Sequence, residues 1–235
     1  MRLLSALKFD MLSLYRYRIV HAYLLLTIFY IFLLHMMPES GSATASILVI
    51  FTDPVVLGFY FIGGIILLEK SQNTFDSLFV TPFRMEEYII SKVGSLTLLT
   101  VVVCLSIIIL TTGFKINIGT ILLGAFLSAI FFTLFGLTLA VRAKTLNKYF
   151  MISSLYSIIF FLPLLDYLNI FHTWLFYFIP SYATLILIEG GMIDISVWEM
   201  IYAVGMLVIW IGIAYIFAKH SFYKSIILHI GSDKK

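Results

Sequence analysis

The longest polar interruption in the sequence is "LLEKSQNTFDSLFVTPFRMEEYIISK", residues 67–92. Long apolar runs lie on both sides of it, so it joins two hydrophobic segments. The stretch nevertheless keeps large apolar residues between its charges, namely Phe75, Leu78, Phe79, Val80, Pro82 and Phe83. A loop that only connected two helices would not need these side chains. The pattern therefore predicts a segment that packs against another surface.

The composition of the whole chain sets the class of protein. Of 235 residues, 62% are hydrophobic and 11% are charged, whereas a soluble domain carries about 25% charged residues. The mean hydropathy is +1.08. These values predict an all-α integral membrane protein. The net charge of +3 is too small to suggest nucleic acid as a partner, and the single Cys104 excludes an intrachain disulfide.

Six apolar stretches have the length of about 20 residues that is needed to cross roughly 30 Å of hydrocarbon. They are residues 19–37, 47–68, 93–112, 120–141, 149–167 and 197–218. Six spans with short loops fill residues 1–235 as a single transmembrane domain. They leave no room for a soluble catalytic domain of about 100 residues.

The charge distribution predicts the orientation of these spans. With the amino terminus in the cytoplasm, 14 of the 15 Lys and Arg residues lie on the cytoplasmic side, and only Lys115 lies outside. A seventh apolar stretch, residues 170–188, would place the basic carboxyl terminus outside if it crossed. It is broken by Pro180 and carries Trp174, Tyr177 and Tyr182. We therefore expect an external re-entrant hairpin before the sixth span, with a tilted seventh span as the alternative, and both termini on the cytoplasmic side of the cell membrane.

Residues 1–18 show helical amphipathicity rather than the features of a signal peptide, because charges recur throughout them. One arc of the helix carries Leu3, Leu4, Leu7, Met11, Leu14 and Tyr15, and the opposite arc carries Arg2, Ser5, Ser13 and Arg16. The pattern favours an interfacial helix in the headgroup layer. The alternative is the frayed start of a long first span.

The opening stretch then lies in the cytoplasm between spans two and three. Ser71 or Asn73 can cap a helix, after which Phe75, Leu78 and Phe79 share one face. Pro82 ends the segment, so a short helix is expected within residues 71–83. Its apolar face has two possible partners: the chain's own helix ends or the lipid interface, and a cytoplasmic protein.

The order of elements resembles the permease subunit of type-2 ATP-binding-cassette (ABC) exporters. That class has an acidic residue at the end of the second span, a Thr-x-(Asp/Glu)-x-Leu-x-x-Thr-Pro helix, and a Glu and a Lys at the start of the third. "EKSQNTFDSLFVTPFRMEEYIISK" matches this pattern, and the external hairpin "FIPSYATLILIEGG" also fits. "RLLSALKFDM", "FTDPVVLGFYFIGGIILLEK" and "FVTPFR" are similar to the subgroup of fluoroquinolone export permeases.

The resemblance implies that residues 71–83 form a coupling helix that docks on a separate ABC ATPase subunit. The docking residues would be Thr74, Phe75, Asp76, Leu78, Phe79, Thr81, Pro82 and Arg84. Family members commonly have Gly-Thr-Leu-Glu where this chain has Asn73-Thr74-Phe75-Asp76, so the fit to the groove would differ. Six spans are half of what the class needs, so the resemblance also implies a second permease copy or a paralogous permease.

The sequence contains no recognisable catalytic or nucleotide-binding motif. The G-x-x-x-x-G-K-[ST] phosphate loop is absent. ATP and Mg are therefore expected on the partner ATPase, with no cofactor bound by this chain. The five His residues are scattered singly, which predicts no metal site. The protein is predicted not to be an enzyme.

Two acidic residues are candidates for the substrate path. Asp53 lies seven residues into the second apolar run, where an unpaired charge would cost about 2.5–3.5 kcal/mol, so it could face a cavity for a cationic or zwitterionic substrate. Asp53-Pro54 is equally a helix start near the external surface. Asp166 is expected at the external end of the fifth span.

The predicted function is export of an amphiphilic small molecule, such as a fluoroquinolone-like drug, by an ATP-driven complex. The same architecture could instead export a lipid, a peptide antibiotic or an ion. A non-transporting membrane anchor or assembly protein is a further alternative. An ion-driven carrier is disfavoured because the sequence has no convincing internal repeat.

Overall fold

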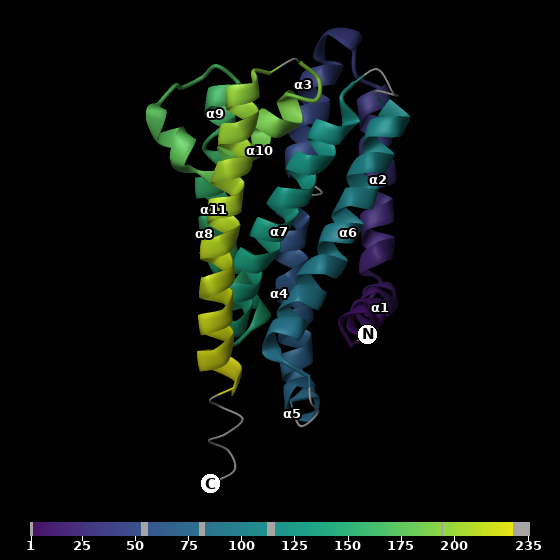
Figure 1. Ribbon diagram of the computed structural model, residues 1–235. Coiled ribbons are helices and arrows are strands. Elements are labelled where there is room, and N and C mark those ends of the chain that lie inside the picture. The colour runs from purple at the N-terminus through teal and green to yellow at the C-terminus, as the bar shows by residue number, and fades with distance from the viewer. Residues whose placement is uncertain (1, 53–55, 80–82, 112–115, 194, 228–235) are drawn as a thin grey trace.

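The computed structural model describes residues 2–52, 56–79, 83–111, 116–193 and 195–227, and these ranges are mostly helical and contain no β-strand (Figure 1). Asp53, Thr81 and Pro82 lie outside the described residues. The helices are α1 (Arg2–Arg16), α2 (Ile19–His35), α3 (Glu39–Ile50), α4 (Val56–Ser71), α5 (Thr74–Leu78), α6 (Met85–Thr111), α7 (Ile118–Arg142), α8 (Leu146–Phe161), α9 (Leu164–Tyr167), α10 (Pro180–Glu189) and α11 (Val197–Phe222). A 3₁₀ turn, η2 (Trp174–Phe178), precedes α10, and a π turn, η3 (Tyr223–Ile227), follows α11.

Several helices are long and apolar enough to cross a membrane. Within the described ranges they are α6, α7, the run Leu146–Tyr167 that joins α8 to α9, and the run Val197–Ile227 that joins α11 to η3. The bent pair of α1 and α2 adds a fifth if it counts as one span. The chain is thus a multi-pass all-α membrane protein. The predicted second span, residues 47–68, falls on the end of α3 and most of α4, and the total of six spans stays a prediction.

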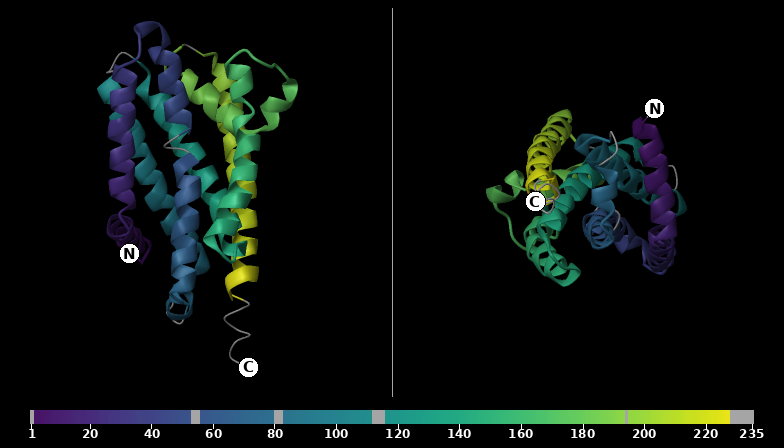
Figure 2. Two further views of the ribbon diagram at one scale, coloured as in Figure 1. Left: turned by 180° about the vertical axis from the view of Figure 1, so that it is seen from behind. Right: turned by 90° about the horizontal axis from the view of Figure 1, so that it is seen from below.

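Helix α7 is the centre of the bundle. Figures 1 and 2 show α4, α6 and α11 beside it, and each of them packs against it. Gly136 allows the close approach of α4, because a Cβ at this position would lie 2.6 Å from the carbonyl oxygen of Phe59. Phe131 and Phe132 of α7 are 1% exposed, and both rings contact the ring of Phe160 in α8.

Helix α1 turns away from the bundle axis. It makes an angle of 66° with α2 at a break formed by Tyr17 and Arg18, and Arg18 has the left-handed φ of 59°. Figure 2 shows α1 lying across the ends of its neighbours. Leu14 is buried against the bundle while Leu4 is exposed. Its position in a headgroup layer stays a prediction.

The segment before α11 forms a compact cap. It consists of η2 and α10, and α10 packs against α7 and α11 through Ala183, Leu187 and other buried side chains. Ten residues of α-helix extend about 15 Å, which is half of the hydrocarbon thickness. The re-entrant hairpin predicted for residues 170–188 falls on these elements, and its depth in a membrane stays a prediction.

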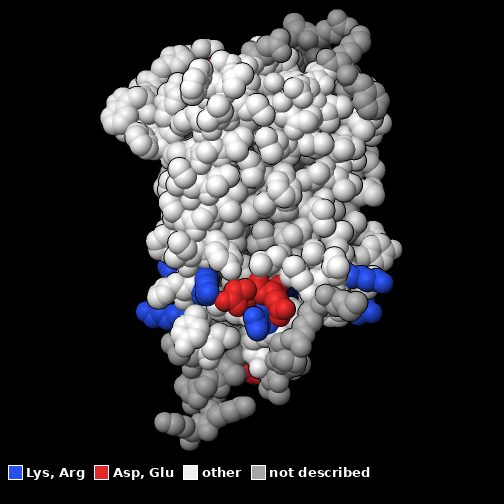
Figure 3. Space-filling model, viewed as in Figure 1, with Lys and Arg blue, Asp and Glu red and all other residues white. Residues whose placement is uncertain are grey.

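The bundle has two different ends, which we call the α5 end and the α10 end. The described Lys and Arg residues lie in or next to α1, at or next to the ends of α4 and α7 and the starts of α6 and α8, and in the last turns of α11 and in η3, all at the α5 end. Figure 3 shows this on one face, where charged side chains form a band near the bottom and uncharged residues cover the part above. Which end faces the cytoplasm stays a prediction.

Candidate functional site

Helix α5 projects at one end of the bundle, between α4 and α6 (Figure 1). Asn73 starts it in a left-handed conformation with φ of 52°, a backbone state that Asn tolerates better than most residues. This residue breaks the chain direction after α4. Asp76 lies in the first turn of α5, where a carboxylate interacts favourably with the positive end of the helix dipole. The helix is short, ending at Leu78.

The ring of Phe75 packs α5 against two long helices. Its side chain is 4% exposed, and its centroid lies 5.6 Å from that of Tyr88 in α6 and 5.7 Å from that of Phe222 in α11, both in edge-on geometry. Phe79 extends the contact, with its ring 5.8 Å from Phe222. Such edge-to-face pairs add about 0.5–1.5 kcal/mol each to the burial of apolar area. The start of α6, the end of α11 and α5 therefore form one packed unit.

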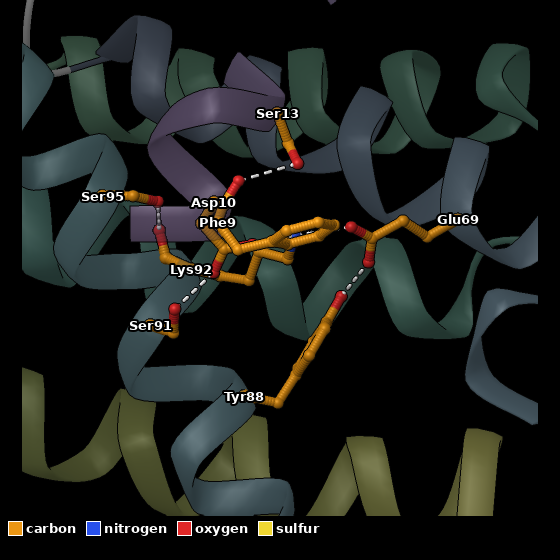
Figure 4. Close-up of polar contacts among 8 residues, drawn as sticks. All are labelled: Phe9, Asp10, Ser13, Glu69, Tyr88, Ser91, Lys92 and Ser95. Carbon is orange, nitrogen blue, oxygen red and sulfur yellow. Dashed lines mark hydrogen bonds and ion pairs between the residues drawn. The ribbon is translucent and has the colours of Figure 1, made fainter. Parts of the chain in front are cut away.

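Tyr88 connects this aromatic contact to a buried ionic network (Figure 4). Its hydroxyl donates to Oε2 of Glu69 at 2.5 Å, and Lys92 Nζ donates to Oε1 of the same carboxylate at 2.5 Å. Lys92 Nζ also lies 2.7 Å from Oδ1 of Asp10, whose Oδ2 accepts a hydrogen bond from the Ser91 hydroxyl. We call these five residues the Lys92 cluster. It joins α1, α4 and α6.

The Lys92 cluster is almost inaccessible to solvent. Asp10, Glu69 and Lys92 are 6%, 7% and 4% exposed. One ammonium faces two carboxylates, and the two hydroxyl donors supply the hydrogen bonds that a single Lys cannot. Buried charges are tolerated only when they are paired and hydrogen-bonded, so each member depends on the others. The cluster consequently fixes the position of α1 against α4 and α6.

The predicted docking residues have different environments. Phe75 is buried inside this chain, whereas Thr74, Leu78 and Phe79 are half-buried. The exposed members are Asp76 and Arg84, and the backbone N–H of Arg84 donates to Glu87 at 2.8 Å. Thr81 and Pro82 are outside the described residues. The surface that α5 offers to a partner is thus polar, and much of its apolar face packs on the chain's own helix ends.

Of the two predicted substrate-path residues, the structure describes only Asp166, and it does not lie at this site. Asp53 lies outside the described residues. Asp166 belongs to α9 near the α10 end, where its Oδ1 lies 2.6 Å from Nδ1 of His172. Among the residues that the structure describes, no three His, Cys, Asp or Glu side chains come together as a group that could hold a metal ion.

The comparison with protein families settles the relationship of this chain. The model of the fluoroquinolones export permease protein family matches residues 1–230. The chain belongs to that family. Two curated proteins from Mycobacterium tuberculosis, of strains CDC 1551 / Oshkosh and ATCC 25618 / H37Rv, carry the name fluoroquinolones export permease protein. Each is 24% identical over 206 residues, which is 86% of this chain and 87% of the relative.

Sequence reasoning did not predict the ionic network of this family member. The resemblance implies an acidic residue at the end of the second span and a Lys at the start of the third, which are Glu69 and Lys92, but it does not predict their contact with Asp10. A signal was available in the helical spacing of α1. Asp10 lies three residues after Leu7 and four before Leu14, so it shares the apolar side of the helix, where an unpaired acid would be unfavourable.

Proposed function

We propose that this chain is the membrane-spanning subunit of an ATP-driven exporter that moves an amphiphilic small molecule, such as a fluoroquinolone-like drug, out of the cell. A separate ABC ATPase binds ATP and Mg and docks on residues 74–84. A second permease copy or a paralogous permease completes the complex, and both termini of this chain lie in the cytoplasm. Membership of the fluoroquinolones export permease protein family and the names of the two relatives support the export role.

The connection of α5 to the bundle is the observation that carries this proposal. A force applied to α5 passes through Phe75 to Tyr88 of α6 and Phe222 of α11. From Tyr88 it passes through Glu69 and the rest of the Lys92 cluster to α4 and α1. A small cytoplasmic helix that is rigidly joined to four long or amphipathic elements is suited to transmit the closure of an ATPase to membrane spans.

Co-purification with the ATPase and ATP-dependent export from vesicles test the proposal together. The matched variants are Ser77→Arg, on the exposed side of α5, and Asn147→Arg, an exposed position at the start of α8. Both place the same bulky cation on the surface without disturbing the core. We expect Ser77→Arg to reduce ATPase association and export at least about tenfold, since it would place a cation in the docking surface, and Asn147→Arg to behave as the wild type.

Each other outcome contradicts a defined part of the proposal. Equal ATPase association in both variants would mean that the ATPase does not dock on α5. Stable association of the wild type with no ATP-dependent export would favour a membrane anchor or assembly protein. Export that continues in the absence of any ATPase would exclude ATP as the energy source.

A further inference from the structure

A pocket of about 510 Å³ lies between the end of α4 and the start of α8. The two helices pack against each other, and both can be followed in the left view of Figure 2. Ligand sites for small molecules commonly have volumes of about 300–1,000 Å³. The lining has an apolar part, Gly64, Leu67, Leu68 and Leu146, and a polar part, Lys70, Ser71, Lys144 and Thr145. The pocket thus offers one apolar and one polar region to a ligand.

The polar part of the pocket is positively charged. Neither Lys70 nor Lys144 forms an ion pair with an Asp or Glu that the structure describes, and the described lining contains no acidic residue. Burial lowers the pKa of Lys70, and the charge of Lys144 lowers it further. The first turn of α8 also contains no acidic residue. An anion in the pocket would therefore bind two cations that repel each other, with no carboxylate to displace.

The end of α7 holds the ammonium of Lys70 in position. Its Nζ donates to the carbonyl oxygens of Val141 and Ala143 at 3.3 and 3.4 Å. These carbonyls lie at the negative end of the α7 dipole, which favours a cation. Because an ammonium has three donors, Lys70 can also donate to a ligand while it keeps both contacts. The half-buried side chain is therefore an ordered cation at the wall of the pocket.

The pocket crosses the predicted edge of the membrane. The predicted second span ends at Leu68, so Gly64 lies inside the predicted hydrocarbon depth and Lys70 lies just beyond it. Leu68 and Leu146 are 36% and 43% exposed, and a Cβ at Gly64 would meet no heavy atom within 4 Å. An apolar chain therefore has open space along α4, directly next to the two cations.

We infer that this pocket binds a phospholipid with an anionic headgroup. The phosphate of the lipid lies between Lys70 and Lys144, and an acyl chain lies along Gly64 and Leu68. Two cations without a carboxylate partner select an anionic headgroup over a zwitterionic one, and the open apolar wall selects a lipid over a free phosphate. Basic pockets between transmembrane helices recur as binding sites for anionic lipid headgroups. The inference does not rest on the proposed export function, because the pocket lies apart from the docking residues of α5.

Native mass spectrometry of the full chain in detergent, titrated with lipid, tests this inference. The probes are dioleoylphosphatidylglycerol, which is anionic, and dioleoylphosphatidylcholine, which has the same acyl chains but no net charge. The matched variants are Lys144→Met, in the lining, and Lys148→Met, an exposed residue of α8 outside the lining. We expect the wild type and Lys148→Met to bind phosphatidylglycerol at least about fivefold more tightly than phosphatidylcholine, and Lys144→Met to lose most of this preference.

A second pair of variants examines the apolar part of the pocket. Gly64→Leu places a side chain in the open space along α4 and leaves the charge of the pocket unchanged. It should weaken the binding of phosphatidylglycerol at least about fivefold. Gly205→Leu adds the same side chain to α11, where no heavy atom lies within 4 Å of the added Cβ, and should bind the lipid as the wild type does. The same spectra give the oligomeric mass of each variant.

Several outcomes would overturn the inference. Equal affinity of the wild type for the two lipids would exclude selection of an anionic headgroup. An equal loss of preference in Lys144→Met and Lys148→Met would mean that the lipid responds to the surface charge as a whole and not to this pocket. Displacement of phosphatidylglycerol by inorganic phosphate at the same concentration, with no effect of Gly64→Leu, would mean a site for a free anion. A lower oligomeric mass of Lys144→Met with unchanged lipid binding would assign this face to a second copy of the chain.

Discussion

Two sets of ionic contacts join α6 to its neighbours, and they differ in burial more than in geometry. Lys92 lies 2.7 Å from Asp10 and 2.5 Å from Glu69, with side chains 5–10% exposed. Glu86 and Lys219 lie 2.9 Å apart with side chains 40% and 49% exposed. The Lys92 cluster links α6 to α1 and α4, whereas the outer pair links α6 to α11.

The comparison indicates that the same chemistry has two different roles in one helix. Water screens the outer pair, so its formation contributes little to folding. The Lys92 cluster is shielded from water, so its charges must satisfy one another. We therefore expect substitutions in the cluster to lower stability and substitutions in the outer pair to leave it almost unchanged.

Removing the ammonium of the cluster should have the largest effect. Lys92→Met keeps the length of the side chain but leaves Asp10 and Glu69 buried without a cation, and breaking a buried pair in this way costs about 3–5 kcal/mol. The variant should show a lower midpoint of thermal unfolding in detergent and a lower yield of monodisperse protein. Lys148→Met, at an exposed position at the same end of the bundle, is the control. Equal midpoints for the two variants would mean that the cluster does not hold α1 in place.

Two adjacent glycines of α4 also differ in how closely the rest of the protein packs against them. A Cβ at Gly63 would lie 1.9 Å from the ring of Tyr149, whose hydroxyl donates to the carbonyl of Phe59, whereas a Cβ at Gly64 would meet nothing within 4 Å. Gly63→Ala should therefore destabilise the bundle by about 1–3 kcal/mol through overpacking. Gly64→Ala should be neutral or stabilising by up to about 1 kcal/mol, because Ala is the better helix former. Unfolding midpoints of the two variants in the same detergent provide the measurement.

Local patterns in the sequence were sufficient to predict most of the helices. The apolar runs correspond to α2, α6, α7, α8 and α11, and the amphipathic spacing of residues 1–18 corresponds to α1. The possible cap at Ser71 or Asn73 and the spacing of Phe75, Leu78 and Phe79 predict a helix in the polar stretch. Asn73 precedes α5, but its side chain forms no capping hydrogen bond, and α5 is shorter than the predicted range of residues 71–83. These features are local, since periodicity and capping depend on residues within a few positions of one another.

The candidate site depends on distant contacts that local patterns do not contain. Asp10 is 82 residues from Lys92, and Phe75 is packed by Phe222 from the end of α11. The sequence showed that the apolar face of α5 must be buried, but it left open whether the partner was the chain itself or another protein. The structure buries Phe75 within the chain because the start of α6 and the end of α11 lie beside it. Only the arrangement of helices around α7 determines which ends meet.

A smaller effect is expected where a hydroxyl rather than a charge is removed from the cluster. Tyr88→Phe keeps the ring that packs on Phe75 but removes the donor to Glu69, and we expect a loss of about 1–3 kcal/mol. Tyr223→Phe, on an exposed side chain beyond α11, is the control and should leave the unfolding midpoint unchanged. A midpoint for Tyr88→Phe equal to that of the control would show that Lys92 alone satisfies the Glu69 carboxylate.

The smallest effect on stability is expected at the outer pair. Glu86→Gln removes the charge that faces Lys219 while keeping the shape of the side chain, and solvent screening makes exposed pairs of this kind contribute little. We expect an unfolding midpoint equal to that of the wild type at both low and high salt. If Glu86→Gln lowered the unfolding midpoint, and high salt lowered the midpoint of the wild type to the same extent, the pair would be shown to hold α6 to α11.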